Sequence, residues 1–146
     1  MLIEEFDKNR HDSTAVSELL AMAVGLPTPK KLANLMDNFY SSEDRRIFLT
    51  LDDEKPIGML GIDFTNHSHG VITHLATAPE RRKQGIAVSL INHVARKLKL
   101  KDIVAETDQD AVEFYRVIGF KTEEIESRWP GVKRFKCSKQ LMAEVN

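Results

Sequence analysis

Cationic side chains are concentrated in PERRKQGIAVSLI, residues 79–91, between an expected strand and an expected helix. Arg81, Arg82 and Lys83 come just before Gly85. Cations in the first turn of a helix oppose the partial positive charge of its unpaired N–H groups. A bound anion removes this conflict, because N–H groups at a helix start bind phosphate oxygens and a glycine lets a phosphate approach the backbone closely. The spacing therefore predicts a phosphate-binding loop.

The elements beside this loop follow from the spacing of apolar residues. The run 71–78 is rich in β-forming residues and stops at Pro79, which cannot continue a hydrogen-bonded ladder. After the loop, an apolar stripe at helical spacing predicts a helix, and it consists of Ala87, Leu90, Ile91, Val94 and Leu98. The loop thus joins a strand to an amphipathic helix.

The rest of the chain supplies the frame. We expect an N-terminal edge strand, a helix that begins at Asp12 or Ser13, and a second helix capped by Thr28. Further strands are expected at residues 46–51, 56–64, 102–107, 120–126 and 132–138, with 102–107 buried in the sheet, and a short helix capped by Asp110 precedes the last two. The order β-α-α-β-β-β-α-β-α-β-β predicts an α/β (α+β) fold with a mixed sheet flanked by helices.

Composition limits the classes of protein. The 146 residues are 42% hydrophobic and 29% charged, which fits a single domain, 1–146. The formal net charge of −1 argues against general nucleic-acid or membrane binding. One cysteine, Cys137, cannot form an internal disulfide. With no signal-like start and no apolar run of about 18 residues, we expect a cytoplasmic protein.

Two motifs give the chain a resemblance to a known family. Arg82, Gly85 and Ala87 match the GNAT acetyltransferase signature in which Gln or Arg is followed by Gly three residues later and by Gly or Ala five residues later. The stretch DAVEFYRVIGF, residues 110–120, is similar to the later A-x-x-F-Y-x-x-x-G-F element of that family. The resemblance implies a GNAT-like sheet whose fourth and fifth strands splay apart to hold acetyl-CoA.

The resemblance also implies a set of cofactor contacts. The backbone of the strand would run beside the pantetheine arm, and the loop would bind the pyrophosphate. The expected residues are Leu75, Ala76, Thr77, Arg82, Lys83, Gln84, Gly85, Ile86 and Ala87. No metal is expected, because His67 and His69 lie in a sequence typical of a turn.

Acetyl transfer needs a neutral amine, a proton acceptor and a proton for the leaving thiolate. By resemblance Tyr115 is the leaving-group acid, although its spacing also suits a core tyrosine. Some family members carry a glutamate on the fourth strand, where this chain has Val71. Glu106 is the first candidate for a catalytic carboxylate, and His74 or a water chain are the alternatives.

The leading function is therefore acetyl-CoA-dependent N-acetylation of an amine on a small molecule, peptide or protein. The missing glutamate leaves open an acyl-CoA-binding regulatory module without turnover. A nucleic-acid binder using residues 81–83 is disfavoured, since no aromatic residues alternate with the cations. We expect a monomer or a homodimer, and the sequence leaves the acceptor undefined.

Overall fold

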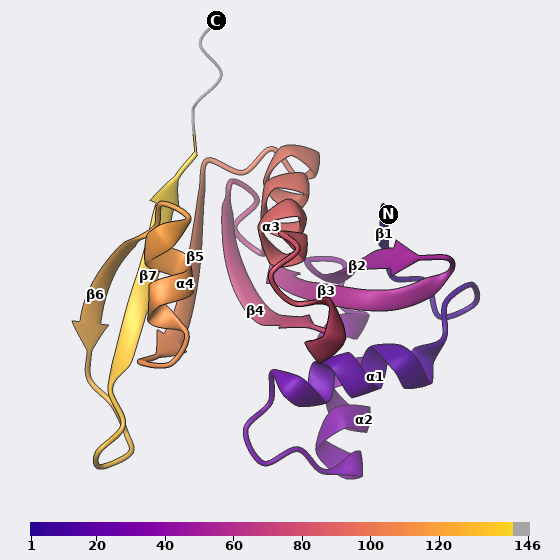
Figure 1. The fold of residues 1–146 in the computed structure, drawn as a ribbon, viewed down its shortest axis with the longest axis horizontal. Helices are drawn as coiled ribbons and strands as arrows, with labels where there is room; N and C mark the ends of the chain where they lie inside the picture. The colour runs from indigo at the N-terminus through magenta and orange to yellow at the C-terminus, as the bar shows by residue number, and fades with distance from the viewer. Residues whose placement is uncertain (142–146) are drawn as a thin grey trace, which may run out of the picture.

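The computed structural model describes residues 1–141, which form one mixed seven-stranded sheet with helices on both faces (Figure 1). The strand order is β1-β2-β3-β4-β5-β7-β6. The strands are β1 (Leu2–Glu5), β2 (Arg45–Asp52), β3 (Lys55–Asp63), β4 (His69–Thr77), β5 (Asp102–Asp108), β6 (Lys121–Ile125) and β7 (Arg134–Gln140). This is the mixed sheet that the sequence predicts.

The helices also follow the predicted order. They are α1 (Ser13–Met22), α2 (Pro29–Asp37), α3 (Ile86–Lys97) and α4 (Val112–Val117), with short 3-10 turns η1 (Phe39–Ser41) and η2 (Pro79–Arg81). Asp12 begins α1 by accepting from the N–H groups of Thr14 and Ala15. Thr28 caps α2, as predicted, and its hydroxyl oxygen lies 3.1 Å from the Lys31 nitrogen. None of the helices in residues 1–141 has the length and apolarity needed to cross a membrane.

One predicted cap was wrong. The side chain of Asp110 does not cap α4; instead Asp108 Oδ1 accepts from the N–H groups of Asp110 and Ala111, at 3.0 and 3.2 Å. Asp108 ends β5, so its carboxylate already faces the turn into the helix. Strand β5 is also less buried than predicted: Ile103 and Ala105 are buried, whereas Glu106 is exposed. Beyond Ala105 the strand loses its β4 partner, and Glu106, Thr107 and Asp108 line an open cleft.

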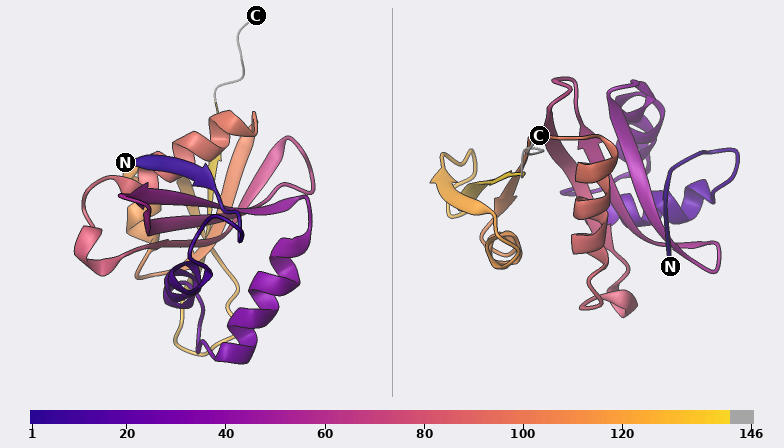
Figure 2. Two further views of the ribbon diagram at one scale, coloured as in Figure 1. Left: turned by 90° about the vertical axis from the view of Figure 1, so that its right-hand side faces the viewer. Right: turned by 90° about the horizontal axis from the view of Figure 1, so that it is seen from above.

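The core lies around β2 and β3, between helices on opposite faces of the sheet (Figure 2). Two glycines of β3 show the two faces: a Cβ at Gly58 would meet Ile86 of α3, and a Cβ at Gly61 would meet Tyr40 of η1. The largest fully buried side chains include Phe48, Leu49, Met59, Leu60, Leu90 and Ile103. Burying each contributes about 1.5–3 kcal/mol to the stability of the fold.

Strands β4 and β5 are joined at one end only. Residues 69–72 pair in parallel with residues 102–105. Beyond this point β4 continues beside β3, while β5 continues beside β7 to Asp108. His69 Nδ1 lies 2.6 Å from Asp102 Oδ2 at the joined end. The divergence separates β5, β7, β6 and α4 from the rest of the sheet (Figure 1).

Candidate active site

A cleft of about 1030 Å³ lies where β4 and β5 diverge. Its walls come from β4, the loop after it, the start of α3, the end of β5 and α4. A volume at the upper end of the range for small-molecule sites suits a large ligand. Of the residues proposed from the sequence for cofactor binding or catalysis, it is lined by His74, Leu75, Ala76, Thr77, Arg82, Lys83, Gly85, Ile86, Ala87, Glu106 and Tyr115, and Arg81 lines it as well.

The loop between β4 and α3 has the backbone that a phosphate cradle needs. Gly85 is the N-cap residue of α3, with φ of +76°, and it provides no side-chain hydrogen bond to the helix. The first N–H groups of an α-helix have no partner within the helix, so those of Ile86 and Ala87 can meet an anion. Lys83 also has a positive φ, of +65°, which is uncommon for a residue with a side chain.

The three adjacent cations do not have equivalent surroundings. Arg81 Nη2 lies 2.7 Å from Asp52 Oδ2 at the end of β2, and Arg81 Nε donates to the Gln84 side chain. All three cations line the cleft, but Arg81 is half-buried, whereas Arg82 and Lys83 are exposed. Gln84 is not among the lining residues, so its side chain holds Arg81 rather than facing the cleft.

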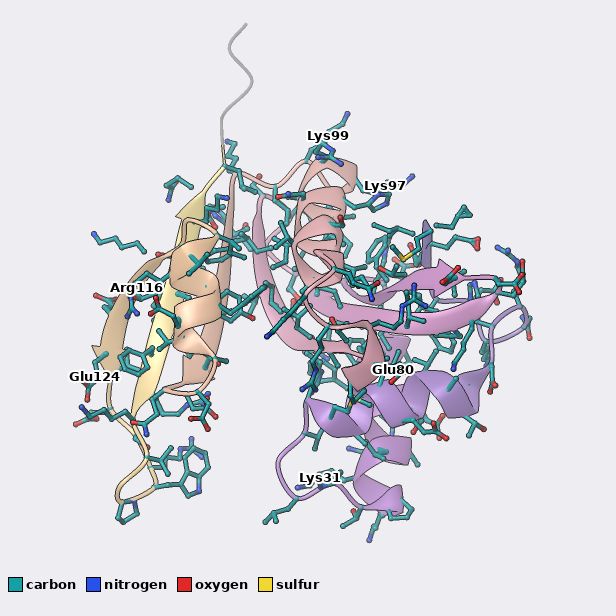
Figure 3. The ribbon with its side chains drawn as sticks, in the orientation of Figure 1. Lys31, Glu80, Lys97, Lys99, Arg116 and Glu124 are labelled. Carbon is teal, nitrogen blue, oxygen red and sulfur yellow. The ribbon has the colours of Figure 1, made fainter. Side chains whose placement is uncertain are left out.

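More cations lie at the other end of α3, where Lys97 and Lys99 project away from the loop (Figure 3). Positive charge at a helix C-terminus complements the helix dipole. These lysines therefore stabilise the helix, in contrast with the cations near its start.

Tyr115 projects from α4 into a tightly packed wall of the cleft. It is 6% exposed, and its ring packs edge-on against Phe114 and Phe120 with centroids 5.1 Å apart in each pair. Burial, with a smaller effect from the Cys137 thiol, raises the pKa of Tyr115 above its usual value of 10.0. The hydrogen bonds among residues 1–141 include none to its hydroxyl. Tyr115 thus keeps its proton at neutral pH and has a hydroxyl free for a ligand.

Glu106 lies on the same side of the cleft as α4, facing β4. It is exposed and stands opposite Lys136 in the β5–β7 register, just beyond the last residue that pairs with β4. Asp108 and Glu113 line the same cleft. The cleft therefore has cations at the α3 loop and carboxylates along β5 and α4.

A β-bulge interrupts the β3–β4 pairing beside the cleft. Gly61 pairs with His74 and Ile62 with Ile72, so Thr73 has no partner in the register. The Tyr40 hydroxyl lies 2.6 Å from Thr73 Oγ1 and 2.5 Å from His74 Nδ1. Burial lowers the pKa of His74 below 6.5 and raises that of Tyr40.

This cluster is not predicted by the sequence pattern, although His74 is one of the candidate bases. Tyr40 and Thr73 are far apart in the chain, so no local pattern links them. Gly61, inside β3, is a weak indication of the bulge, because a glycine within a strand often marks a bulge or a close approach of another group. Val71 is 45% exposed and is not among the lining residues, whereas Thr73 and His74 are. Val71, the residue compared with the family's glutamate, therefore does not face the cleft.

Comparisons with known proteins agree with this geometry. A model of the acetyltransferase (GNAT) family matches residues 14–120. An uncharacterized N-acetyltransferase of Bacillus methanolicus is 36% identical over 62 residues, which cover 42% of this chain and 52% of that protein. The match thus spans about half the length of this curated relative.

Solved structures share the whole fold. An aminoglycoside 6'-N-acetyltransferase complexed with coenzyme A has a TM-score of 0.78 at 17% identity, with full coverage of both chains. The ribosomal-protein-S18-alanine N-acetyltransferase of Escherichia coli has a TM-score of 0.76 at 15% identity, covering 98% of this chain and 96% of that one. A GNAT acetyltransferase of Elizabethkingia anophelis with acetyl-CoA bound has 0.69 at 17%, covering 96% and 97%.

The mixed sheet with its splayed central strands and flanking helices is the acyl-CoA N-acyltransferase fold. The chain belongs to the acetyltransferase (GNAT) family.

Proposed function

We propose that this protein transfers the acetyl group of acetyl-CoA to a primary amine by direct attack in a ternary complex. The observation that carries the proposal is the cleft itself, which combines an open strand edge, a glycine-containing cationic loop and a buried tyrosine. Family membership supports acyl transfer, and coenzyme A or acetyl-CoA is bound in two of the similar structures.

The free edge of β4 suits the pantetheine arm. Beyond Ile72 this edge has no β5 partner, so backbone groups of Leu75, Ala76 and Thr77 are available to hydrogen-bond an extended ligand as a neighbouring strand would. The pyrophosphate would then reach the N–H groups from Lys83 to Ala87, with the Arg82 side chain alongside. The residues present therefore fit acetyl-CoA.

The reacting groups meet further along the same cleft. The neutral amine attacks the carbonyl carbon, a C–N bond forms and the C–S bond breaks. Tyr115 gives its hydroxyl proton to the departing thiolate, a role suited to a phenol that stays protonated at neutral pH. Glu106, on β5, provides negative charge that attracts the ammonium form of the acceptor and is a candidate to take its proton.

The second candidate is an acyl-CoA-binding module without turnover, since no carboxylate of β4 lines the cleft in the described part of the chain. The two candidates share the cofactor cleft and differ in catalysis. Binding alone therefore cannot separate them.

Two measurements test the proposal. Acetyl-CoA should raise the unfolding temperature, because a ligand that binds the folded state stabilises it. CoA release should then appear with a member of an amine panel containing an alkylamine, a polyamine, an aminoglycoside and a peptide with N-terminal alanine. A thermal shift without CoA release from any amine favours the binding module, and the absence of a shift refutes both candidates.

A further inference from the structure

Tyr40, Thr73 and His74 form a hydrogen-bonded cluster beside the cleft, on the β4 side. We call it the bulge cluster, because Thr73 is the unpaired residue of the β4 bulge. Both hydroxyl contacts are short, 2.6 Å to Thr73 Oγ1 and 2.5 Å to His74 Nδ1. The bulge allows two consecutive residues of β4 to reach one atom, which a regular strand would direct to opposite faces.

The surroundings of the cluster keep it fixed. A Cβ at position 61 would lie 1.8 Å from the Tyr40 hydroxyl, so this hydroxyl rests on the bare backbone of Gly61. Phe39 packs edge-on against both the Tyr40 and His74 rings, with centroids 4.9 and 6.2 Å apart. His74 is half-buried and lines the cleft with its neighbours Thr73 and Leu75. His74 Nδ1 is thus hydrogen-bonded to Tyr40, while the imidazole ring borders the cleft.

We propose that His74 takes the proton of the attacking amine at Nε2, and that Tyr40 is the residue that positions it. The inference rests on the proposed acetyl transfer and deepens it. In the balanced reaction, the amine nitrogen bonds to the acetyl carbon and gives its proton to His74, while the thiolate takes one from Tyr115. Afterwards His74 loses its proton to water and Tyr115 regains one from water.

This role requires one arrangement of hydrogens. His74 Nδ1–H donates to the Tyr40 oxygen, and the Tyr40 hydroxyl donates to Thr73 Oγ1, which leaves a lone pair on Nε2. The same arrangement serves the protonated ring, since an imidazolium also donates at Nδ1. Proton uptake at Nε2 therefore needs no rearrangement of the cluster.

Burial favours the neutral ring of His74 as the resting state. Burial is the cause of its lowered pKa, and Tyr40 stays a neutral phenol. On the η1 and β3 side, Asp63 is paired with Arg45, at 3.2 Å between Oδ2 and Nε. Across the cleft, the carboxylate of Glu106 can draw an ammonium group toward His74.

The activity test uses the full chain, acetyl-CoA and the amine of the panel that gives the fastest CoA release. His74→Gln should reduce kcat by about 10² or more, the scale of a positioned general base, and remove the acidic limb of the pH–rate profile. Tyr40→Phe should lower kcat by about tenfold, the scale of one hydrogen bond, and move that limb to lower pH, because the imidazolium loses its hydrogen-bond acceptor. His67→Gln, which removes a histidine from the exposed β3–β4 turn, should leave both unchanged.

A structural role for the cluster would leave the imidazole tautomer unaffected, so nitrogen NMR is the second readout. In the acetyl-CoA complex of the parent, the ¹⁵N shifts of His74 should show a protonated Nδ1 and an unprotonated Nε2. Tyr40→Phe should shift the ring toward the opposite tautomer. Thr73→Ser, which retains the hydroxyl, should keep the parent's His74 tautomer, whereas Thr73→Val, which lacks it, should change the tautomer.

The outcomes separate this inference from the proposed function. If the parent releases CoA and His74→Gln keeps the acidic limb, or if Glu106→Gln removes it, His74 is not the base although acetyl transfer stands. A resting Nε2–H tautomer also overturns the inference. If no amine supports CoA release by the parent, both proposals fail.

Discussion

Arg81 Nη2 lies 2.7 Å from Asp52 Oδ2, which ties the loop between β4 and α3 to the end of β2. The next residue, Arg82, lines the same cleft but is exposed, and no ion pair within the described residues holds it. Two adjacent arginines thus have different surroundings: Arg81 holds the loop in place, and Arg82 is placed to meet a ligand phosphate.

Arg82→Ala should therefore weaken acetyl-CoA binding by about tenfold or more, the scale of a hydrogen bond to a charged group. Binding of acetyl-pantetheine, which lacks the pyrophosphate, should be nearly unchanged. Isothermal titration with both ligands measures the difference. Arg81→Ala serves as the matched arginine and should change folding stability by about 1 kcal/mol or less, as expected for an exposed ion pair. An equal loss for both ligands in Arg82→Ala would show that Arg82 acts through the fold.

Gly85→Val should abolish acetyl-CoA binding. In the free protein a Cβ at this position has no heavy atom within 4 Å, so the side chain would occupy the space that a phosphate needs. The positive φ adds a backbone cost of about 1–3 kcal/mol. Gly131→Val is the control, because Gly131 also has φ of +76° and open surroundings but lies in the β6–β7 loop. Gly131→Val should lose a similar amount of folding stability as Gly85→Val, and its affinity for acetyl-CoA should equal that of the parent. Equal affinity in a folded Gly85→Val protein would place the phosphate site elsewhere.

Tyr115→Phe should lower kcat and leave the acetyl-CoA dissociation constant nearly unchanged. Only a hydroxyl is lost, and the packing with Phe114 and Phe120 is retained. General acids are worth about 10² to 10⁴ in rate, and a thiol with a pKa near 8.5 needs only the lower end of that help. Steady-state kinetics with a second acyl donor, whose thiol is more acidic, should show a smaller loss. Full turnover in the variant would assign the proton to water.

Gly61→Ala should destabilise the fold by about 1–3 kcal/mol, because the new methyl meets the Tyr40 hydroxyl. Combined with Tyr40→Phe, it should cost less than the sum of the two single changes. The relief should be partial, since Tyr40 Cζ would also lie 2.7 Å from the methyl. Urea unfolding of all four proteins gives the coupling. Gly58→Ala, whose methyl would meet Ile86 on the opposite face, should be additive with Tyr40→Phe.

The lowered pKa of His74 also predicts a pH effect on stability. Between its folded pKa and the ordinary value of 6.5, the unfolded chain binds more protons than the folded one. This histidine's contribution to stability is therefore complete above pH 6.5 and is lost as the pH falls through the folded pKa. Urea unfolding at a series of pH values should show a shallower acidic decline for His74→Gln than for the parent, with parallel curves above pH 7.5. If the stability of both proteins declines equally at acidic pH, the pKa of His74 is not lowered in the folded state.

The local sequence pattern by itself determined the helices and the proposed phosphate-binding loop. The apolar spacing of α3, the Pro29 and Thr28 start of α2 and the glycine before Ile86 all act within a few residues, where helix geometry and caps are decided. For the same reason, the GNAT resemblance could be found from two short motifs. These motifs also indicate the residues proposed to bind acetyl-CoA, without knowledge of the tertiary structure.

Contacts between distant segments depended on tertiary structure. The β4 bulge, which shifts the register after Gly61, brings His74 and Thr73 to Tyr40, and no local pattern marks a partner 34 residues away. Similarly, the spacing of Arg81, Arg82 and Lys83 indicates a cationic loop, but only the position of Asp52 at the end of β2 distinguishes Arg81 from Arg82. Strand register and long-range packing set these pairings, because each depends on how the whole sheet buries its faces.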